Sequence, residues 1–322
     1  MKDEITFAEG TITFDRFFDF TTMIQSLSAK AAKALATHKG ALHLNALNTL
    51  SVEAAEGLAK HKGSLFLNGR TELLGGALRA LAKHGGQLLS LKCLVELSES
   101  AAHVLASHKH PLSLDGLITL SDVAANALAE HEESLSLKSV SSISDEAVTA
   151  LATRKAYRDL QLDGLTTLSD AAARALAIPK GTLSLNGLTR ISPTVAEALA
   201  SHDGDLSLGG LKRLSPERAT ILATHEGRLS LNGLTKASDV VLSELAQHGG
   251  ELELNGLTSL SIAEASALRD LDFDLGLRGL KSLSDAVADI LGECSTVFLS
   301  KCCNSQEECL RIIKRHKAIN FD

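Results

Sequence analysis

Large aromatic side chains are nearly absent from this chain of 322 residues. It contains no Trp and one Tyr, and aromatic residues make up 3 % of the total, whereas hydrophobic residues make up 44 %. A core organised around large rings is therefore excluded. The sequence predicts instead a core of leucine and alanine packed in layers.

The chain also lacks an excess of positive charge and any long apolar run. Its formal net charge is −7 at pH 7 and its sequence pI is about 6.0, which argues against a general binder of nucleic acid or anionic membrane. No stretch approaches the ~20 apolar residues of a membrane-spanning helix, and residues 1–10 carry charges in place of an apolar signal segment. We therefore expect a soluble, cytoplasmic protein that binds neither nucleic acid nor membrane.

Cysteine is scarce and unevenly placed. Cys93 stands alone, and the other four lie near the C-terminus at Cys294, Cys302, Cys303 and Cys309. An odd number in this distribution differs from the paired cysteines of secreted scaffolds and favours reduced thiols. The C-terminal group also lacks the CxxC spacing of a zinc site. Buried thiols in a terminal cap are the favoured interpretation, with disulfide pairing and metal binding as alternatives.

Sequence motifs of common catalytic sites are missing as well. The chain contains no GxGxxG or GxxxxGK[ST] phosphate loop and no GxSxG nucleophile elbow. Its recurrent serines have no neighbouring general base supplied by the sequence pattern. These absences predict a protein that is not an enzyme and carries no cofactor.

What the chain does have is a repeat of about 23 residues with the form LxLNGLxxLSDxAAxALAxHxG. The first leucine recurs at positions 42, 65, 89, 112, 135, 160, 183, 206, 229, 252 and 275. Leu112 and Leu114 illustrate the alternation of a short half-buried strand, and Ala124, Ala125 and Leu128 follow at helical spacing. A strand and a helix in each repeat indicate a solenoid.

A serine precedes the predicted helix in ten of the eleven repeats, where its side chain would cap the first turn. These serines are Ser51, Ser98, Ser121, Ser144, Ser169, Ser192, Ser215, Ser238, Ser261 and Ser284. Repeat two departs from the pattern with Leu74, followed by Gly75 and Gly76, which predicts a weaker helix start.

These features resemble leucine-rich-repeat proteins over roughly residues 42–299. The resemblance is carried by the LxL pairs (Leu42/Leu44, Leu183/Leu185, Leu229/Leu231), the following leucines (Leu47/Leu50, Leu188, Leu234) and the Asn after the second leucine (Asn45, Asn68, Asn186, Asn232, Asn255). The usual pattern LxxLxLxxNxL places that Asn three residues later, so we regard the chain as an irregular, bacterial-style variant. The resemblance implies an α/β fold and a protein-binding or scaffold role without catalysis.

The expected architecture is a curved horseshoe with about twelve strands in one parallel sheet on the concave side and helices on the convex side. Curvature is expected because stacked strands lie ~4.8 Å apart, whereas packed helices lie ~8–10 Å apart. We predict an N-terminal cap at residues 1–41, eleven repeats at 42–296 and a C-terminal cap at 297–322.

The predicted N-terminal cap contains a helix over 28–38 and a phenylalanine-rich segment, and the C-terminal cap contains a strand over 297–299 and a helix over 305–316. The phenylalanines are Phe7, Phe14, Phe17, Phe18 and Phe20. They are interpreted as a cover for the first repeat, with an aromatic docking patch as the alternative.

A histidine recurs near the end of most predicted helices. The members are His38, His61, His84, His108, His131, His202, His225 and His248. We interpret them as residues of the last helical turn that bond unpaired carbonyl oxygens. A metal site along the row is the alternative, although the repeat supplies no second ligand beside each imidazole.

Three features are candidate sites for binding another protein. The first is Phe66 on the strand surface, and the second is an insertion in repeat five with Arg154, Lys155, Tyr157 and Arg158, because Tyr and Arg are enriched in binding hot spots. The third is a basic ridge with Arg190, Arg213 and Lys236 at equivalent loop positions and Lys212 beside them. The alternative for each cation is ordinary solvation, and the rival function is a structural spacer without a dedicated ligand.

Overall fold

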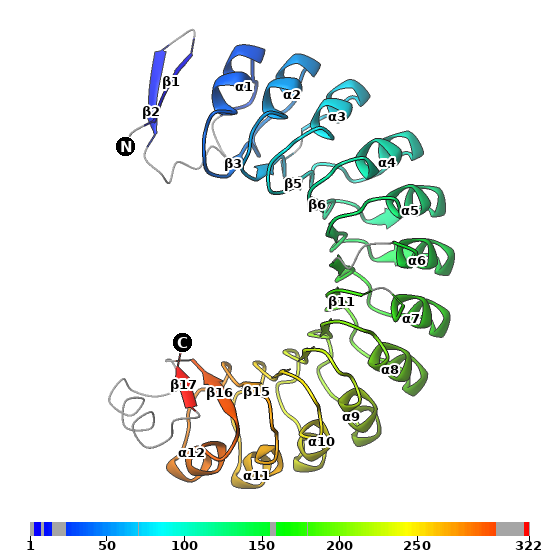
Figure 1. Cartoon of the computed structure of the whole chain (residues 1–322), viewed down its shortest axis with the longest axis vertical. Helices are drawn as coiled ribbons and strands as arrows, with labels where there is room; N and C mark the ends of the chain where they lie inside the picture. The colour runs from blue at the N-terminus through cyan, green and yellow to red at the C-terminus, as the bar shows by residue number, and fades with distance from the viewer. Residues whose placement is uncertain are drawn as a thin grey trace. The chain divides into compact units, whose positions relative to one another are not determined.

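The computed structural model of this chain is a succession of short strands and helices (Figure 1). It describes residues 3–7, 10–14, 24–69, 71–154, 159–178, 180–300 and 319–321, the first two ranges as backbone alone. The chain forms two compact units, residues 1–161 and 162–322. Each unit is described by itself below.

Unit 1 contains a hairpin followed by strand and helix repeats. The hairpin pairs β1 (Asp3–Phe7) with β2 (Gly10–Phe14). A parallel sheet follows, and its strands in order are β3 (Leu42–His43), β4 (Leu65–Phe66), β5 (Leu89–Ser90), β6 (Leu112–Ser113), β8 (Leu135–Ser136) and β10 (Leu160–Gln161). The described helices are α1 (Ala29–Leu35), α2 (Val52–Leu58), α3 (Gly75–Leu81), α4 (Glu99–Ala106), α5 (Asp122–Leu128) and α6 (Asp145–Ala152). A further parallel pair, β7 (Thr119–Leu120) with β9 (Ser142–Ile143), was not predicted.

Unit 2 repeats the same design. Its parallel sheet has β11 (Leu183–Ser184), β12 (Leu206–Ser207), β13 (Leu229–Ser230), β14 (Leu252–Glu253), β15 (Asp274–Gly276), β16 (Thr296–Leu299) and β17 (Ile319–Phe321) in order. The described helices are α7 (Asp170–Leu176), α8 (Pro193–Ala200), α9 (Pro216–Ala223), α10 (Asp239–Leu245), α11 (Ile262–Leu268) and α12 (Asp285–Leu291). In both units the strands form one layer and the helices another (Figure 1).

The repeat register is set by the leucines. Leu206 of β12 pairs with Leu229 of β13, and Leu229 pairs with Leu252 of β14, so each strand is offset from the next by one whole repeat. The leucines at both ends of each LxL pair are buried, as are the alanines on the inner helix face. This confirms the predicted layered core of leucine and alanine. Small alanines allow neighbouring helices to approach closely.

The predicted serine caps are confirmed in all ten repeats. Each serine side chain accepts a hydrogen bond from the backbone N–H three residues later. At Ser261 the cap is reciprocal, because the Glu264 carboxylate also accepts from the Ser261 N–H. Leu74, as predicted, makes no side-chain cap at the start of α3.

The expected terminal elements are described in part. Helix α1, capped by Ser28, lies within the helix predicted for the N-terminal region, and β16 contains the strand predicted over 297–299. Strand β17 was not predicted. The side chains of the phenylalanine-rich segment and the helix predicted over 305–316 lie outside the described residues. The predicted caps therefore stay predictions.

Candidate functional site

Side chains between the two buried leucines of each strand point to the side of the sheet away from the helices. Together with the residue after the second leucine, they form what we call the strand face. In unit 1 its central positions are His43, Phe66, Ser90, Ser113, Ser136 and Gln161, and in unit 2 they are Ser184, Ser207, Ser230, Glu253, Gly276 and Phe298. A continuous row of side chains from consecutive repeats is the basic geometry of this surface.

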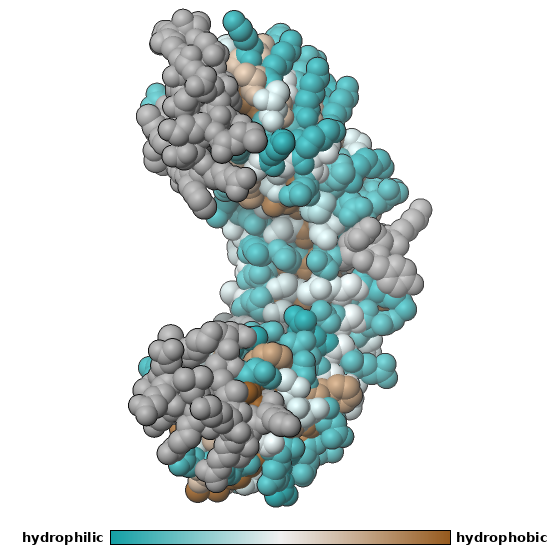
Figure 2. Space-filling model, turned by 60° about the vertical axis from the view of Figure 1, so that its left-hand side comes forward, coloured by the Kyte–Doolittle hydropathy of each residue, from teal (hydrophilic) through white to brown (hydrophobic). Residues whose placement is uncertain are grey.

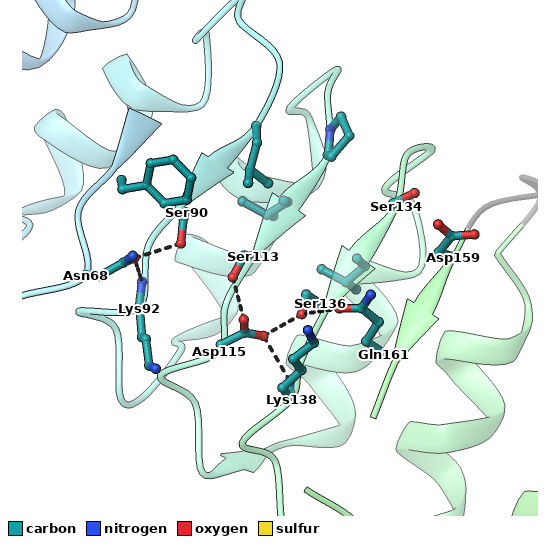
Figure 3. A pocket seen from close by; sticks show the side chains of 15 residues that line it. Asn68, Ser90, Lys92, Ser113, Asp115, Ser134, Ser136, Lys138, Asp159 and Gln161 are labelled. Carbon is teal, nitrogen blue, oxygen red and sulfur yellow. Dashed lines mark hydrogen bonds between the residues drawn. The ribbon is translucent and has the colours of Figure 1, made fainter. Parts of the chain in front are cut away.

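Hydrogen bonds between repeats order the strand face of unit 1 (Figure 3). Asp115 is the centre of this network, since its Oδ2 accepts from Ser113 Oγ at 2.9 Å and its Oδ1 accepts from Ser136 Oγ at 2.5 Å. The same Oδ1 accepts from the backbone N–H of Lys138 at 3.0 Å, and Ser136 Oγ also lies 2.9 Å from Gln161 Oε1. Asp115 thereby joins its own repeat to the next one, and Gln161 of the repeat after that lies beside Ser136.

The asparagines of the repeat have the same role in unit 2. Asn186 Oδ1 accepts from the backbone N–H of Gly209 at 2.6 Å, and Asn232 Oδ1 accepts from that of Asn255 at 2.8 Å. Asn255 Oδ1 in turn accepts from the N–H of Arg278 at 2.9 Å. The spacing of Asn in the sequence did not reveal this backbone-bonding role, which links each repeat to the next.

A hollow of about 400 Å³ lies on the strand face of unit 1. It is lined by Phe66, Asn68, Leu88, Ser90, Lys92, Pro111, Leu112, Ser113, Asp115, Ser134, Leu135, Ser136, Lys138, Asp159 and Gln161 (Figure 3). Most of its lining residues are polar or charged, and Phe66, Leu88 and Pro111 are among those that add apolar surface. Lys92 and Lys138 are exposed at equivalent positions on either side of Asp115, and neither forms a salt bridge within the described part of the chain.

Phe66, a predicted partner-binding residue, lies in this hollow. Its ring is half-buried and stacks on His43 of the neighbouring strand, with centroids 4.4 Å apart and planes 2° from parallel. Of this stacked pair, Phe66 lines the hollow. The sequence analysis identified Phe66 but missed Lys92 and Lys138. The pattern that could have revealed them is a lysine at the same repeat position in two of three consecutive repeats.

The predicted basic ridge lies in unit 2. Arg190, Lys212, Arg213 and Lys236 are all exposed, and none of the four takes part in a salt bridge with a described residue. Arg190 and Arg213 line a common notch together with Arg218, which the sequence analysis did not single out.

The insertion in repeat five is only partly described. Arg154 is buried, and its guanidinium donates to the backbone carbonyls of His131 and Glu133. Our inclusion of Arg154 in an exposed partner-binding surface was therefore wrong, because this side chain fills the place that histidine occupies in most other repeats. Lys155, Tyr157 and Arg158 lie outside the described residues, and their role stays a prediction.

The recurrent histidines form stacks inside each unit. In unit 1, His61, His84, His108 and His131 follow one another with ring centroids 6.1 to 6.3 Å apart. In unit 2, His202, His225 and His248 do so at 6.4 and 6.1 Å. All seven are buried, whereas His38 is half-buried.

The predicted position of these histidines in the last helical turn was wrong by a few residues. Helix α2 ends at Leu58, and His61 follows it, with its backbone N–H bonded to Leu58 O. The imidazole reaches back toward the preceding repeat, so that His108 Nδ1 lies 3.1 Å from Ala82 O. The bonded carbonyls therefore belong to the preceding repeat and not to the histidine's own helix.

Several ring nitrogens of the row have no hydrogen-bond partner among the described residues, including both nitrogens of His61, His84, His131 and His248. Burial and, to a smaller extent, the nearby histidines together lower the pKa of His84 to about 4. Burial and then the Arg154 guanidinium lower the pKa of His131, also to about 4. These imidazoles are thus neutral at physiological pH. No group of three or more His, Cys, Asp or Glu residues in the described ranges has the arrangement of a metal site.

Burial raises the pKa of the two described thiols, Cys93 and Cys294, to about 11 each. Both are free cysteines, and Cys294 is buried where its Sγ lies 3.5 Å from Leu268 O. The remaining three cysteines lie outside the described residues.

Exposed apolar side chains are scattered over the surface. The larger ones are Val52, Leu74, Val95, Ile118, Val123, Ile178, Val240, Ile262 and Phe273. On the side of the molecule seen in Figure 2, hydrophobic residues form small separate patches among hydrophilic ones. Within the described residues, no helix has the length and apolar character needed to cross a membrane.

No family profile matches the sequence, and no curated protein matches it significantly. Solved structures to which the chain is similar include a leucine-rich-repeat protein of Leptospira interrogans, at 18 % identity and a TM-score of 0.37, covering 93 % of this chain and 99 % of that one. An internalin of Listeria monocytogenes gives 16 % identity and a TM-score of 0.45, with 90 % and 88 % covered. A chain of the mouse RP105/MD-1 complex has 17 % identity and a TM-score of 0.45, and the match covers 85 % of this chain and 57 % of that one.

The repeat geometry itself identifies the fold. Each repeat supplies one short strand whose LxL leucines are buried, a turn, and a helix capped by serine in all but one of the repeats, and consecutive strands pair in parallel one repeat apart. Both units of this chain are leucine-rich-repeat solenoids with a parallel sheet on one side and helices on the other.

Proposed function

We propose that the protein is a non-enzymatic recognition module that binds another protein through the strand face of unit 1, with the basic ridge of unit 2 as a second contact region. The observation that carries this proposal is the hollow of about 400 Å³. Its walls are side chains from the same positions of successive strands, held by bonds between repeats. A surface ordered before binding loses little side-chain entropy when a partner docks.

The composition of the hollow indicates the chemistry of the partner. Phe66, Leu88 and Pro111 offer apolar contact. Lys92 and Lys138 supply exposed positive charge on either side of Asp115, whose carboxylate already accepts hydrogen bonds from two serines. A partner segment with an apolar side chain followed by carboxylates complements this arrangement. The exposed cations of the basic ridge favour an acidic partner as well.

The strand-face serines support a second candidate function, that of a structural spacer. Ser113 and Ser136 in unit 1 and Ser184 and Ser207 in unit 2 donate their hydroxyl hydrogens to Asp or Asn side chains of their own or a neighbouring repeat. Hydroxyls used in this way stabilise the stack whether or not a partner binds.

Affinity capture from the native host distinguishes the two functions. The double variant Lys92→Glu/Lys138→Glu and the double variant Arg190→Glu/Arg213→Glu are compared with wild type and with Lys83→Glu, an exposed cation outside both surfaces. Recognition predicts one protein that is retained by wild type and Lys83→Glu and lost with the first double variant. A second loss with Arg190→Glu/Arg213→Glu assigns the ridge to the interface. Identical capture by all four proteins supports the spacer.

A further inference from the structure

A small notch in unit 2 brings three arginines together. Its volume is about 130 Å³, and it is lined by Arg190, Ile191, Leu211, Arg213, Leu214, Ser215 and Arg218. Arg190 and Arg213 occupy equivalent loop positions of consecutive repeats, and Arg218 lies at the start of α9. No carboxylate is among these lining residues. Three positive charges therefore share one concave site without a counter-charge in its described wall.

Arg218 is held in position at the base of this notch. Its Nε donates to the backbone carbonyl of Ile191 at 2.8 Å, and its Nη1 donates to Ser215 Oγ at 2.9 Å. An arginine has five N–H donors, so these two bonds fix the guanidinium plane and leave further N–H groups for a ligand. The side chain is half-buried, and its orientation is established before any ligand arrives.

The other two arginines and the apolar wall complete the site. Arg190 and Arg213 are exposed and also line the notch. Ile191 and Leu211 are buried beneath the notch. An apolar, partly enclosed wall lowers the local dielectric constant, which strengthens the attraction between guanidinium groups and an anion.

We propose that this notch binds a phosphoryl group, either as free phosphate or as a phosphomonoester. Its volume is well below the roughly 300–1,000 Å³ of pockets that enclose whole drug-sized ligands, so it accommodates a single small group. Guanidinium groups bind phosphate through paired N–H donors. A phosphomonoester carries nearly two negative charges and three acceptor oxygens and so engages several arginines together, whereas a carboxylate has one charge and two oxygens.

This inference deepens the ridge part of the proposed function, because Arg190 and Arg213 belong to both. It is tested with small anions alone. A negative titration therefore leaves recognition by the strand face standing, and a failed partner capture leaves the notch standing.

The experiment is a calorimetric titration of the full chain with inorganic phosphate at constant ionic strength. We expect saturable binding at one site, with the affinity reduced at least tenfold in Arg190→Gln and in Arg213→Gln. Lys236→Gln is the matched control, since Lys236 lies on the same ridge but does not line the notch, and its affinity stays within twofold of wild type. Thermal unfolding of each variant shows that the fold is intact.

Parallel titrations with O-phosphoserine and acetate identify the ligand class. Binding of O-phosphoserine at least as tightly as phosphate assigns the notch to phosphomonoesters, and binding of inorganic phosphate alone assigns it to the free ion. The proposal is overturned if phosphate does not saturate, if acetate binds equally well, or if Lys236→Gln weakens binding as much as Arg213→Gln.

Discussion

The side chain of Asn186 accepts a hydrogen bond from the backbone N–H of Gly209, twenty-three residues later, with an Oδ1 to N distance of 2.6 Å. The same Oδ1 accepts from Ser207 Oγ at 2.8 Å, and the amide nitrogen donates to Ser184 Oγ at 2.8 Å. One side chain thus satisfies backbone and hydroxyl groups of two repeats. Stacking depends on such bonds because each strand is only two or three residues long over most of the array.

We expect Asn186→Ala to lower the free energy of unfolding by about 1–3 kcal/mol, because it leaves the partly buried Gly209 N–H without its acceptor. Asn126→Ala is the control, since Asn126 is exposed on α5 and donates to Asp122 O within its own helix. We expect its effect to stay within about 0.5 kcal/mol. Urea unfolding followed by circular dichroism measures both, and equal effects would remove the special role of the asparagine.

Most repeats have a glycine in the turn after the strand, and the preceding repeat lies close to it. A Cβ at Gly233 would lie 2.1 Å from the carbonyl oxygen of Gly209, whereas a Cβ at Gly249 would meet nothing within 4 Å. We expect Gly233→Ala to lower the free energy of unfolding of unit 2 by about 1–3 kcal/mol, because the backbone must move to make room for the new Cβ. Gly249→Ala should be neutral or slightly stabilising. Thermal unfolding of the two variants provides the comparison, and a tolerated Gly233→Ala would contradict the close approach of the repeats.

The cap missing from α3 offers a stabilising substitution. Leu74 is 67 % exposed and precedes α3 without a side-chain bond. Leu74→Ser introduces the hydroxyl found in the other repeats and should raise the free energy of unfolding by about 0.5–2 kcal/mol. Leu74→Ala removes the same apolar side chain without adding a cap and serves as the control. If the two variants have the same stability, the serine caps of the other repeats contribute less than we infer.

Stability should fall with acidification through the buried histidines. The pKa values of the buried His84 and His131 are lowered to about 4 in the folded state, against about 6.5 in the unfolded chain. Between pH 6.5 and 4 the unfolded state therefore binds more protons than the folded state. The contribution of these histidines to the free energy of unfolding is complete above about pH 6.5 and decreases as the pH falls through this window. The loss per histidine is on the order of 3 kcal/mol at pH 4.

Denaturant unfolding at pH 7, 6 and 5 measures this dependence. His84→Leu should flatten the decline, because an apolar side chain at this buried position takes up no proton. His103→Leu alters an exposed histidine on α4 and should leave the slope as in wild type. A wild-type stability that stays constant from pH 7 to 5 would show that these imidazoles are not buried as described.

The strand and the helix of each repeat and the serine caps were predictable from sequence because each follows from short-range patterns. Leu112 and Leu114 alternate around one residue, and Ser121 precedes a helix-forming segment. The partners of Asn186 were not predictable, since a hydrogen bond between residues 23 apart depends on how the repeats stack.

The same limit applies to the candidate sites. The repeat placed a histidine near the end of most helices, but whether its ring turned toward its own helix or the preceding repeat depended on the packing between repeats. Arg154 was included in the partner-binding insertion because Arg is enriched in binding hot spots, whereas its alignment with His131 was the better guide to its burial. Lys92 and Lys138 became visible as a pair only when stacking brought them to one hollow with Phe66.

The central claim is that the strand face of unit 1 is the surface that meets a partner, and site-specific photo-crosslinking tests it most directly. A photoreactive residue is placed at Lys138, which lines the hollow, or at Thr149, an exposed residue of α6 on the helix side, and each protein is irradiated in extract of the native host. The account predicts a discrete cross-linked protein from position 138 and none from position 149. A cross-link from position 149 alone, or no cross-link from either, would contradict it.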